Sequence, residues 1–163
     1  MSWIATVGGV GYLRPASGTW GSAAAVLLAW LLHGLGGFPL LAVATLVAFF
    51  AGWWATIGHV AKVGTEDPSE VVIDEVVGQW IALWPLSLGL WHAGTAAWVF
   101  PWPGWVLAFF AFRAFDILKP GPIGRADRME TPLGVMLDDV FAGIGAAVLV
   151  ALGAYIAHGV MGV

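Results

Sequence analysis

The charged residues of this chain are confined to a few segments, and long uncharged stretches separate them. No Asp, Glu, Lys or Arg stands between Arg14 and Lys62, between Glu75 and Arg113, or after Asp139. Sixty per cent of the 163 residues are hydrophobic and ten per cent are charged, whereas soluble domains carry about 25% charged residues. A soluble fold would leave much apolar surface in water, so we expect an integral membrane protein.

The chain contains five mainly apolar runs that we expect to be membrane helices. The runs comprise residues 20–32, 38–61, 68–85, 104–119 and 132–158. Residues 1–19 are rich in Gly and are expected to be irregular, and residues 121–130 are expected to form a charged loop. Residues 86–103 are apolar but interrupted by Gly and Pro, so they either extend the third span or lie in the membrane interface.

Two of the expected helices begin with the same signal. Asp67 precedes Pro68 and Thr131 precedes Pro132, which places an N-cap residue before a proline at the first helical position. The N-terminal residues lack a basic segment followed by a long apolar run, so no cleavable signal peptide is expected.

The distribution of charge predicts how the chain crosses the membrane. Five crossings place every charged segment on one side, and the Lys and Arg residues among them make that side cytoplasmic. We therefore expect one all-α bundle over residues 1–163, with the N-terminus inside and the C-terminus outside. An even number of spans would divide the charged segments between both sides.

Acidic pairs stand at the same spacing after the two prolines. Asp74 and Glu75 follow Pro68 as Asp138 and Asp139 follow Pro132, which predicts that both pairs lie about 9–10 Å inside their helices. Asp116 approaches the same layer from the opposite direction.

Small residues follow the acids at helical spacing, and small faces let membrane helices approach closely. They are Gly78, Gly143 and Ala147. We therefore expect the carboxylates of the two pairs to converge.

Close carboxylates in a low dielectric must either be protonated or bind a cation. Ion pairing is one alternative, but Arg113 is the only basic residue at comparable depth and cannot balance five carboxylates. A set of oxygen ligands in a chain without cysteine favours Mg²⁺. The predicted metal ligands are Asp74, Glu75, Asp138 and Asp139, and Glu70 is a further possible ligand.

Basic residues flank the acidic layer and predict a phosphate-binding site at the level of lipid headgroups. Arg113 shares a helix face with Asp116, and Lys119 stands at the rim. Arg125 and Arg128 either bind substrate or anchor the loop at the membrane surface.

Weaker candidates for contacts to phosphate lie in residues 18–22, including Thr19 and Ser22. This segment either offers backbone N–H groups at a helix start or forms a turn and N-cap. His59 is expected to be a packed or interfacial histidine.

Several motifs, in this order, resemble those of the phosphatidylglycerophosphatase A family. The most specific are Phe-Arg-x-Phe-Asp-x-x-Lys-Pro at 112–120 and Met-x-Asp-Asp at 136–139. The others lie at residues 5–8, 18–22 and 74–78, so the resemblance covers nearly the whole chain.

The resemblance implies a Mg²⁺-dependent phosphatase of the bacterial inner membrane that converts phosphatidylglycerophosphate to phosphatidylglycerol and phosphate. It assigns catalytic roles to acidic motif residues and substrate contacts to Arg113 and Lys119. The acidic residues are Asp74, Glu75, Asp116, Asp138 and Asp139.

The residues also narrow the mechanism. The chain has no Cys and no Asp-x-Asp-x-Thr motif, and it lacks the Arg and His set of phosphohistidine lipid phosphatases. The remaining hypothesis is in-line attack by a water that Mg²⁺ and a carboxylate activate, with Arg113 and Lys119 stabilising the phosphoryl oxygens.

Two other functions stay open at this point. A lipid phosphotransferase would share the metal and headgroup site, although its motif Asp-x-x-Asp-Gly-x-x-Ala-Arg is missing. A cation transporter would need charged groups in the other half of the membrane, where this chain has none.

Overall fold

The computed structural model describes residues 2–64 and 68–160, and every regular element in that part is helical. A short N-terminal segment contains α1 (Ser2–Ala5) and η1 (Val10–Tyr12). The long helices are α2 (Ser17–Val63), α3 (Ile73–His92), α4 (Trp102–Leu118) and α6 (Pro132–Tyr155). The short helix α5 (Pro122–Asp127) precedes α6, and the π-helical turn η2 (Ile156–Val160) follows it.

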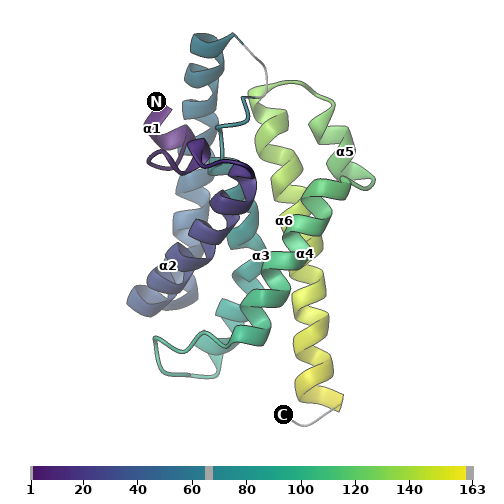
Figure 1. Ribbon diagram of the computed structural model, residues 1–163. Coiled ribbons are helices and arrows are strands. Elements are labelled where there is room, and N and C mark those ends of the chain that lie inside the picture. The colour runs from purple at the N-terminus through teal and green to yellow at the C-terminus, as the bar shows by residue number, and fades with distance from the viewer. Residues whose placement is uncertain (1, 65–67, 161–163) are drawn as a thin grey trace.

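Helix α2 is a hairpin of two helical segments. Its backbone leaves helical geometry at Gly36 and Gly37, and Gly37 adopts a φ of 63°, a left-handed conformation that glycine tolerates best. Pro39 follows the break and cannot continue the hydrogen bonding of the first segment. The chain therefore reverses here, and the second segment returns beside the first (Figure 1).

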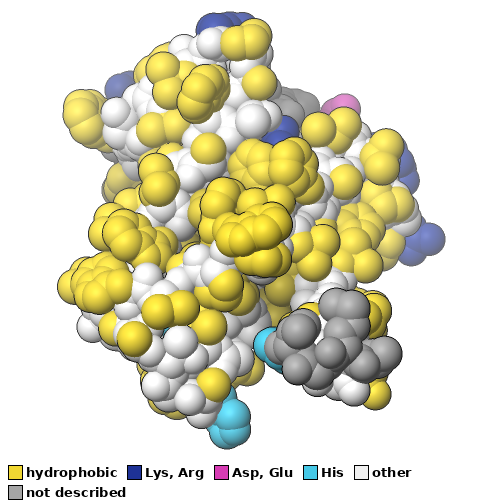
Figure 2. Space-filling view, turned by 60° about the horizontal axis from the view of Figure 1, so that its bottom comes forward, with side chains coloured by type: hydrophobic (Ala, Val, Ile, Leu, Met, Phe, Trp, Pro, Cys, Tyr) yellow, Lys and Arg dark blue, Asp and Glu magenta, His cyan; other side chains and the backbone are white. Residues whose placement is uncertain are grey.

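The long helical segments run between two opposite ends of a bundle (Figure 1). The N-terminal segment, the start of α3, α5 and the start of α6 lie at one end, and the C-terminus lies at the other. On the face seen in Figure 2, hydrophobic side chains spread over the helices while Lys and Arg side chains lie at the edge of the view.

Helices α3 and α6 meet at glycines, as the sequence predicted. A Cβ on Gly78 would lie 2.6 Å from the carbonyl oxygen of Asp139, and a Cβ on Gly143 would lie 2.4 Å from that of Gly78. The two backbones thus touch directly beside the acidic residues. This contact confirms the expected close approach of small faces.

The predicted start of the third helix was wrong. Residue Pro68 lies in a non-helical segment, and α3 begins at Ile73. The N–H of Val72 donates to the carbonyl oxygen of Ala5 at 2.9 Å, so the N-terminal segment holds this stretch outside the helix. The expected N-cap Asp67 lies outside the described residues.

A consequence is that the acidic pairs do not lie at equal distances from their helix starts. Asp74 and Glu75 occupy the first turn of α3, whereas Asp138 and Asp139 lie well inside α6. The prediction that Asp74 and Glu75 lie about 9–10 Å inside their helix was therefore wrong, although the expected convergence of the two pairs is found.

Other boundaries also differ from the predictions. Residues 121–130 contain α5 rather than only a loop. Of the two alternatives for residues 86–103, extension of the third span is found as far as His92, where α3 ends. Helix α2 already begins at Ser17, within the segment expected to be irregular. The N-cap of α6 is confirmed, since the Thr131 side chain accepts from the N–H of Gly134 at 3.0 Å.

Among the residues that the structure describes, two helices are long and apolar enough to cross a membrane by length and composition, namely Ser17–Val63 and Pro132–Gly159. These helices agree with a membrane protein.

Candidate functional site

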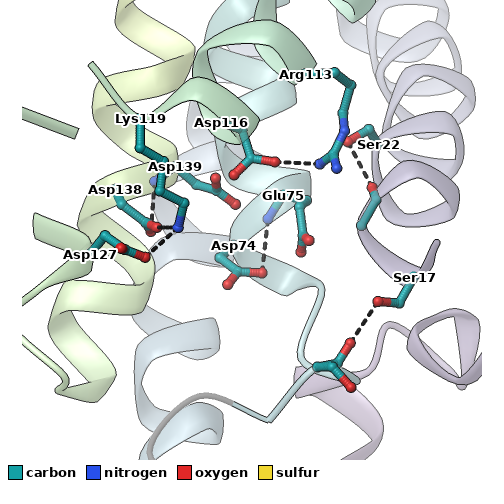
Figure 3. A network of polar contacts seen from close by, with 12 residues as sticks. Ser17, Ser22, Asp74, Glu75, Arg113, Asp116, Lys119, Asp127, Asp138 and Asp139 are labelled. Atoms are coloured by element: carbon teal, nitrogen blue, oxygen red, sulfur yellow. Dashed lines mark hydrogen bonds and ion pairs between the residues drawn. The ribbon is translucent and has the colours of Figure 1, made fainter. Parts of the chain in front are cut away.

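A polar cavity of about 550 Å³ opens where α2, α3, α4 and α6 converge. It contains every acidic residue predicted to be catalytic, together with Arg113 and Lys119 from the predicted phosphate contacts. Lining it are Asp74, Glu75, Arg113, Asp116, Lys119, Asp138 and Asp139. Figure 3 shows these side chains turned toward a common space from three helices and the end of α4.

Three carboxylates form the centre of the cavity. One oxygen each of Asp74, Glu75 and Asp139 lies within 4.8 Å of the others. Asp74 and Asp139 are buried, and the Oε2 atom of Glu75 is buried without a hydrogen-bond partner among the described residues. We refer to these three residues as the carboxylate cluster.

The two acidic pairs share one local geometry. The N–H of Glu75 donates to Oδ1 of Asp74 at 2.9 Å, and the N–H of Asp139 donates to Oδ1 of Asp138 at 2.9 Å. In each pair, the backbone N–H of the second residue thus holds Oδ1 of the first residue. The Oδ2 atom of the first residue and the carboxylate of the second take no part in this hydrogen bond.

Lys119 bridges the α6 pair to α5. Its ammonium group donates to Asp138 at 2.8 Å and also contacts Asp127. Burial alone would lower the pKa of Lys119, but the hydrogen bonds to Asp127 and Asp138 outweigh it and raise the pKa above its usual value. Lys119 therefore remains cationic at neutral pH.

The backbone directs Lys119 into the cavity. The residue caps the C-terminus of α4 with a φ of 45°, an uncommon conformation for a residue with a side chain. Pro120 follows and prevents the helix from continuing, so the side chain lies across the end of α4.

Arg113 and Asp116 form the ion pair that their spacing predicted, with Nη1 and Oδ2 at 2.5 Å. Both side chains are largely buried, with 15% exposed. The Nε atom of Arg113 is buried and has no partner within the described part of the chain. An unpaired N–H of a guanidinium in such a place can bind an anion.

Gly18 supplies the close approach of α2 to this part of the cavity. A Cβ at residue 18 would lie 2.3 Å from Oε1 of Glu75 and 3.0 Å from Nη1 of Arg113. The neighbouring Ser17 hydroxyl donates to the carbonyl oxygen of Ser69 at 2.7 Å. The start of α2 is thereby fixed to the segment before α3. At residue 18, a side chain larger than hydrogen would collide with the side chains of Glu75 and Arg113.

The oxygen ligands that the cavity offers suit a hard cation. The carboxylate cluster offers oxygen atoms only, and Glu75 has an oxygen without a partner. Mg²⁺ binds a few carboxylates and keeps water in its other positions, which the cavity can accommodate. The residues therefore fit Mg²⁺, with a guanidinium and an ammonium group nearby for an anion.

Not every predicted residue enters the cavity. Thr19 is exposed, and the buried Ser22 hydroxyl donates to the carbonyl oxygen of Gly18 at 2.9 Å. Residues 18–22 are already helical, which explains why these hydroxyls do not form a phosphate loop. Glu70 instead lies 3.0 Å from Nε2 of the buried His59.

The two loop arginines do not line the cavity. Arg125 and Arg128 are exposed, which favours the alternative that they anchor this end of the protein.

Several residues that line the cavity were not predicted from the sequence. They are Ser17, Ser69, Asp127 and Glu130. Asp127 was visible as an acid in the segment between the Lys119 and Asp138 motifs, but its contact with Lys119 depends on α5, which was not predicted. Gly18 belonged to a recognised motif, and only the packing of α2 shows its role.

A family model described as Phosphatidylglycerophosphatase A matches residues 3–154 of the chain. The match confirms the resemblance drawn from the motifs. No solved structure matches the protein.

Three named relatives cover most of the chain. A "Phosphatidylglycerophosphatase A" from Haemophilus influenzae is 38% identical over 144 residues, which cover 87% of this chain and 81% of that protein. The protein of the same name from Escherichia coli is 31% identical and covers 78% and 67%. A protein from Bacteroides thetaiotaomicron, named as a proposed phosphatidylinositol-3-phosphatase, is 35% identical and covers 94% and 92%.

Proposed function

The chain belongs to the phosphatidylglycerophosphatase A family of phosphatases, and we propose that it hydrolyses phosphatidylglycerophosphate to phosphatidylglycerol and inorganic phosphate. The observation that carries this proposal is the polar cavity, where three carboxylates stand beside Arg113 and Lys119 at one end of an apolar bundle. A phosphate monoester on a lipid headgroup fits such a cavity in charge and in position.

We assign a Mg²⁺ site to the carboxylate cluster of Asp74, Glu75 and Asp139. When bound there, Mg²⁺ would lower the pKa of a water ligand and neutralise the charge of the phosphoryl oxygens. Asp138 was also predicted as a ligand, but its contact with Lys119 favours a role in positioning that cation.

Residues of the cavity would bind the phosphate, stabilise its charge and accept the proton of the attacking water. The unpaired N–H of Arg113 donates to a phosphoryl oxygen, and Asp116 holds the guanidinium in place. Lys119 stabilises the charge that develops on the transferring group. A carboxylate accepts the proton of the attacking water, the water oxygen bonds to phosphorus, and the bond from phosphorus to the headgroup oxygen breaks. The proton then passes to the headgroup oxygen, which leaves as the alcohol.

We further propose that the two segments of α2 and helices α3, α4 and α6 each cross the bacterial inner membrane. The charged segments then face the cytoplasm, with the N-terminus inside and the C-terminus outside. Support comes from the gathering of the charged segments at one end of the bundle and from the opposite positions of the termini (Figure 1). The active site would lie at the cytoplasmic face.

The test is phosphate release by the purified full chain in mixed micelles. We expect turnover of phosphatidylglycerophosphate with Mg²⁺, loss of activity with EDTA, and recovery when Mg²⁺ is restored. Phosphatidylinositol-3-phosphate serves as the comparison substrate, because one relative carries that name. Faster release from that lipid would refute the proposed substrate, and no release from either would refute the hydrolase.

The same assay separates hydrolysis from group transfer. An alcohol acceptor added at high concentration should leave the phosphate yield unchanged. Transfer of labelled phosphate to the alcohol in place of water would identify a phosphotransferase instead.

A further inference from the structure

A second cavity, of about 690 Å³, lies between the first segment of α2 and α4. Its walls are apolar and include Ala23, Val26 and Leu27 from α2 and Val106, Phe109 and Phe110 from α4. None of these side chains can form a hydrogen bond. Trp30, Phe100 and Trp105 complete the lining, so the cavity is almost entirely apolar and suits a hydrocarbon chain.

This apolar groove lies along the same two helices as the polar cavity. On α4, Phe110 precedes Arg113 by three positions, and on α2, Ala23 follows Gly18 by five. At 1.5 Å per residue these steps are about 5 Å and about 7 Å along the helix axes. A lipid with its phosphate near Arg113 is long enough to reach the groove with an acyl chain.

Aromatic residues close the far end of the groove. The indole of Trp30 donates to the carbonyl oxygen of Trp98 at 3.1 Å, and the two rings meet edge to face with centroids 5.5 Å apart. Phe100 completes this floor. From Ala23 to Trp30 the groove is about 10 Å deep, which lies within one leaflet of a hydrocarbon core about 30 Å thick.

The side of the groove is open. Leu27 is 64% exposed and Phe110 is 66% exposed, although both are large hydrophobic side chains. In a bilayer these residues would contact lipid, so a lipid in the same leaflet could enter from the side without leaving the membrane.

We propose that this groove holds an acyl chain of the lipid substrate while the phosphate occupies the polar cavity. This proposal rests on the proposed function, and it adds the part of the protein that recognises the substrate as a lipid. Lipid tails are as apolar as the groove, so no hydrophobic driving force separates the two environments. Selection therefore comes from the shape of the groove and from its closed end.

The experiment compares two substrates with the same headgroup, one with long and one with short acyl chains, in Val26→Trp and Val106→Trp. Each substitution fills the groove from one wall and leaves the polar cavity unchanged. We expect KM for the long-chain lipid to rise about tenfold, or about 1.4 kcal/mol. Hydrolysis of the short-chain lipid should stay close to wild type, which also shows that the variants fold.

The control lies in another apolar cavity near the site, formed by α4, α5 and α6. Ile144→Trp fills that cavity and should leave the ratio of the two KM values unchanged. Three results would overturn the proposal. They are a raised KM for the long-chain lipid in Ile144→Trp alone, wild-type KM values in both groove variants, and equal increases in KM for the long-chain and short-chain lipids in both groove variants. Wild-type protein that releases phosphate from neither lipid would refute the proposed function itself.

Discussion

The two acidic pairs have the same sequence pattern and the same local hydrogen bond, yet their surroundings differ. Near Glu75 lies the Arg113 guanidinium, which already pairs with Asp116. Beside Asp138 and Asp139, Lys119 binds the first acid directly and leaves the second in the carboxylate cluster.

Two acidic pairs with the same sequence pattern therefore need not have the same function. The partner that each carboxylate meets in the fold decides whether it remains available for a metal. On this basis Asp74, Glu75 and Asp139 are available, while Asp138 neutralises and orients Lys119. The predictions below test that division.

The largest effect is expected for loss of a carboxylate in the cluster. Glu75→Gln and Asp139→Asn should each lower kcat by about a hundredfold or more, since even groups outside the ligand shell cost about 10–100-fold. Both variants should also require more Mg²⁺ for half-maximal activity in a metal titration. Glu70→Gln is the control, because Glu70 contacts His59 outside the cavity, and it should retain near-normal activity.

Arg113→Lys should give the next largest effect, a loss in kcat/KM of about 10–100-fold. A lysine keeps the charge but cannot reproduce the planar fork that binds two phosphoryl oxygens. Steady-state kinetics at saturating Mg²⁺ measure the loss. Arg125→Lys provides the matched control, and wild-type kinetics in a folded Arg113→Lys protein would limit Arg113 to pairing with Asp116.

Asp138→Asn should cost less than Asp139→Asn, about tenfold, and should act through Lys119. A double-mutant cycle with Lys119→Ala tests this directly, because residues that act as one unit give strongly non-additive losses. The double variant should be little worse than Lys119→Ala alone. Additive losses, or a shift in Mg²⁺ requirement as large as that of Asp139→Asn, would make both acids of the α6 pair ligands.

The smallest effect is expected for Gly18→Ala, about fivefold in kcat/KM with an unchanged melting temperature. The new methyl group must displace the ends of the flexible Glu75 and Arg113 side chains, which costs little stability but disturbs the site. Gly89→Ala is the matched control, because it lies in α3 with nothing within 4 Å of a Cβ. Loss of thermal stability in Gly18→Ala alone would give Gly18 a packing role instead.

Contacts set by helical periodicity were predictable from the sequence. The Arg113–Asp116 pair, the Thr131 cap and the close approach at Gly78 all depend on spacing within one helix or on residue size. The family resemblance, which the comparisons confirm, was visible for the same reason, since its motifs are continuous segments of the chain.

Contacts between distant segments were not predictable. Helix α3 begins later than predicted because the N–H of Val72 donates a hydrogen bond to the carbonyl oxygen of Ala5. No local pattern in the sequence predicts that hydrogen bond. Lys119 was expected at the rim as a contact to the substrate phosphate, and its contact with Asp127, which α5 brings to it, was not predicted. In both cases tertiary contacts override the local preferences of the chain.

The contact between Gly78 and Gly143 also determines how the bundle can respond to membranes of different thickness. Helices that adapt to a thinner or thicker bilayer do so mainly by tilting. If α3 pivots where it touches α6, its far end at His92 is about 21 Å from the pivot, whereas Asp74 is only about 6 Å away. If α3 crosses the membrane as proposed, a change of its tilt about this contact would move its far end several times farther than Asp74, and the carboxylates would be displaced little.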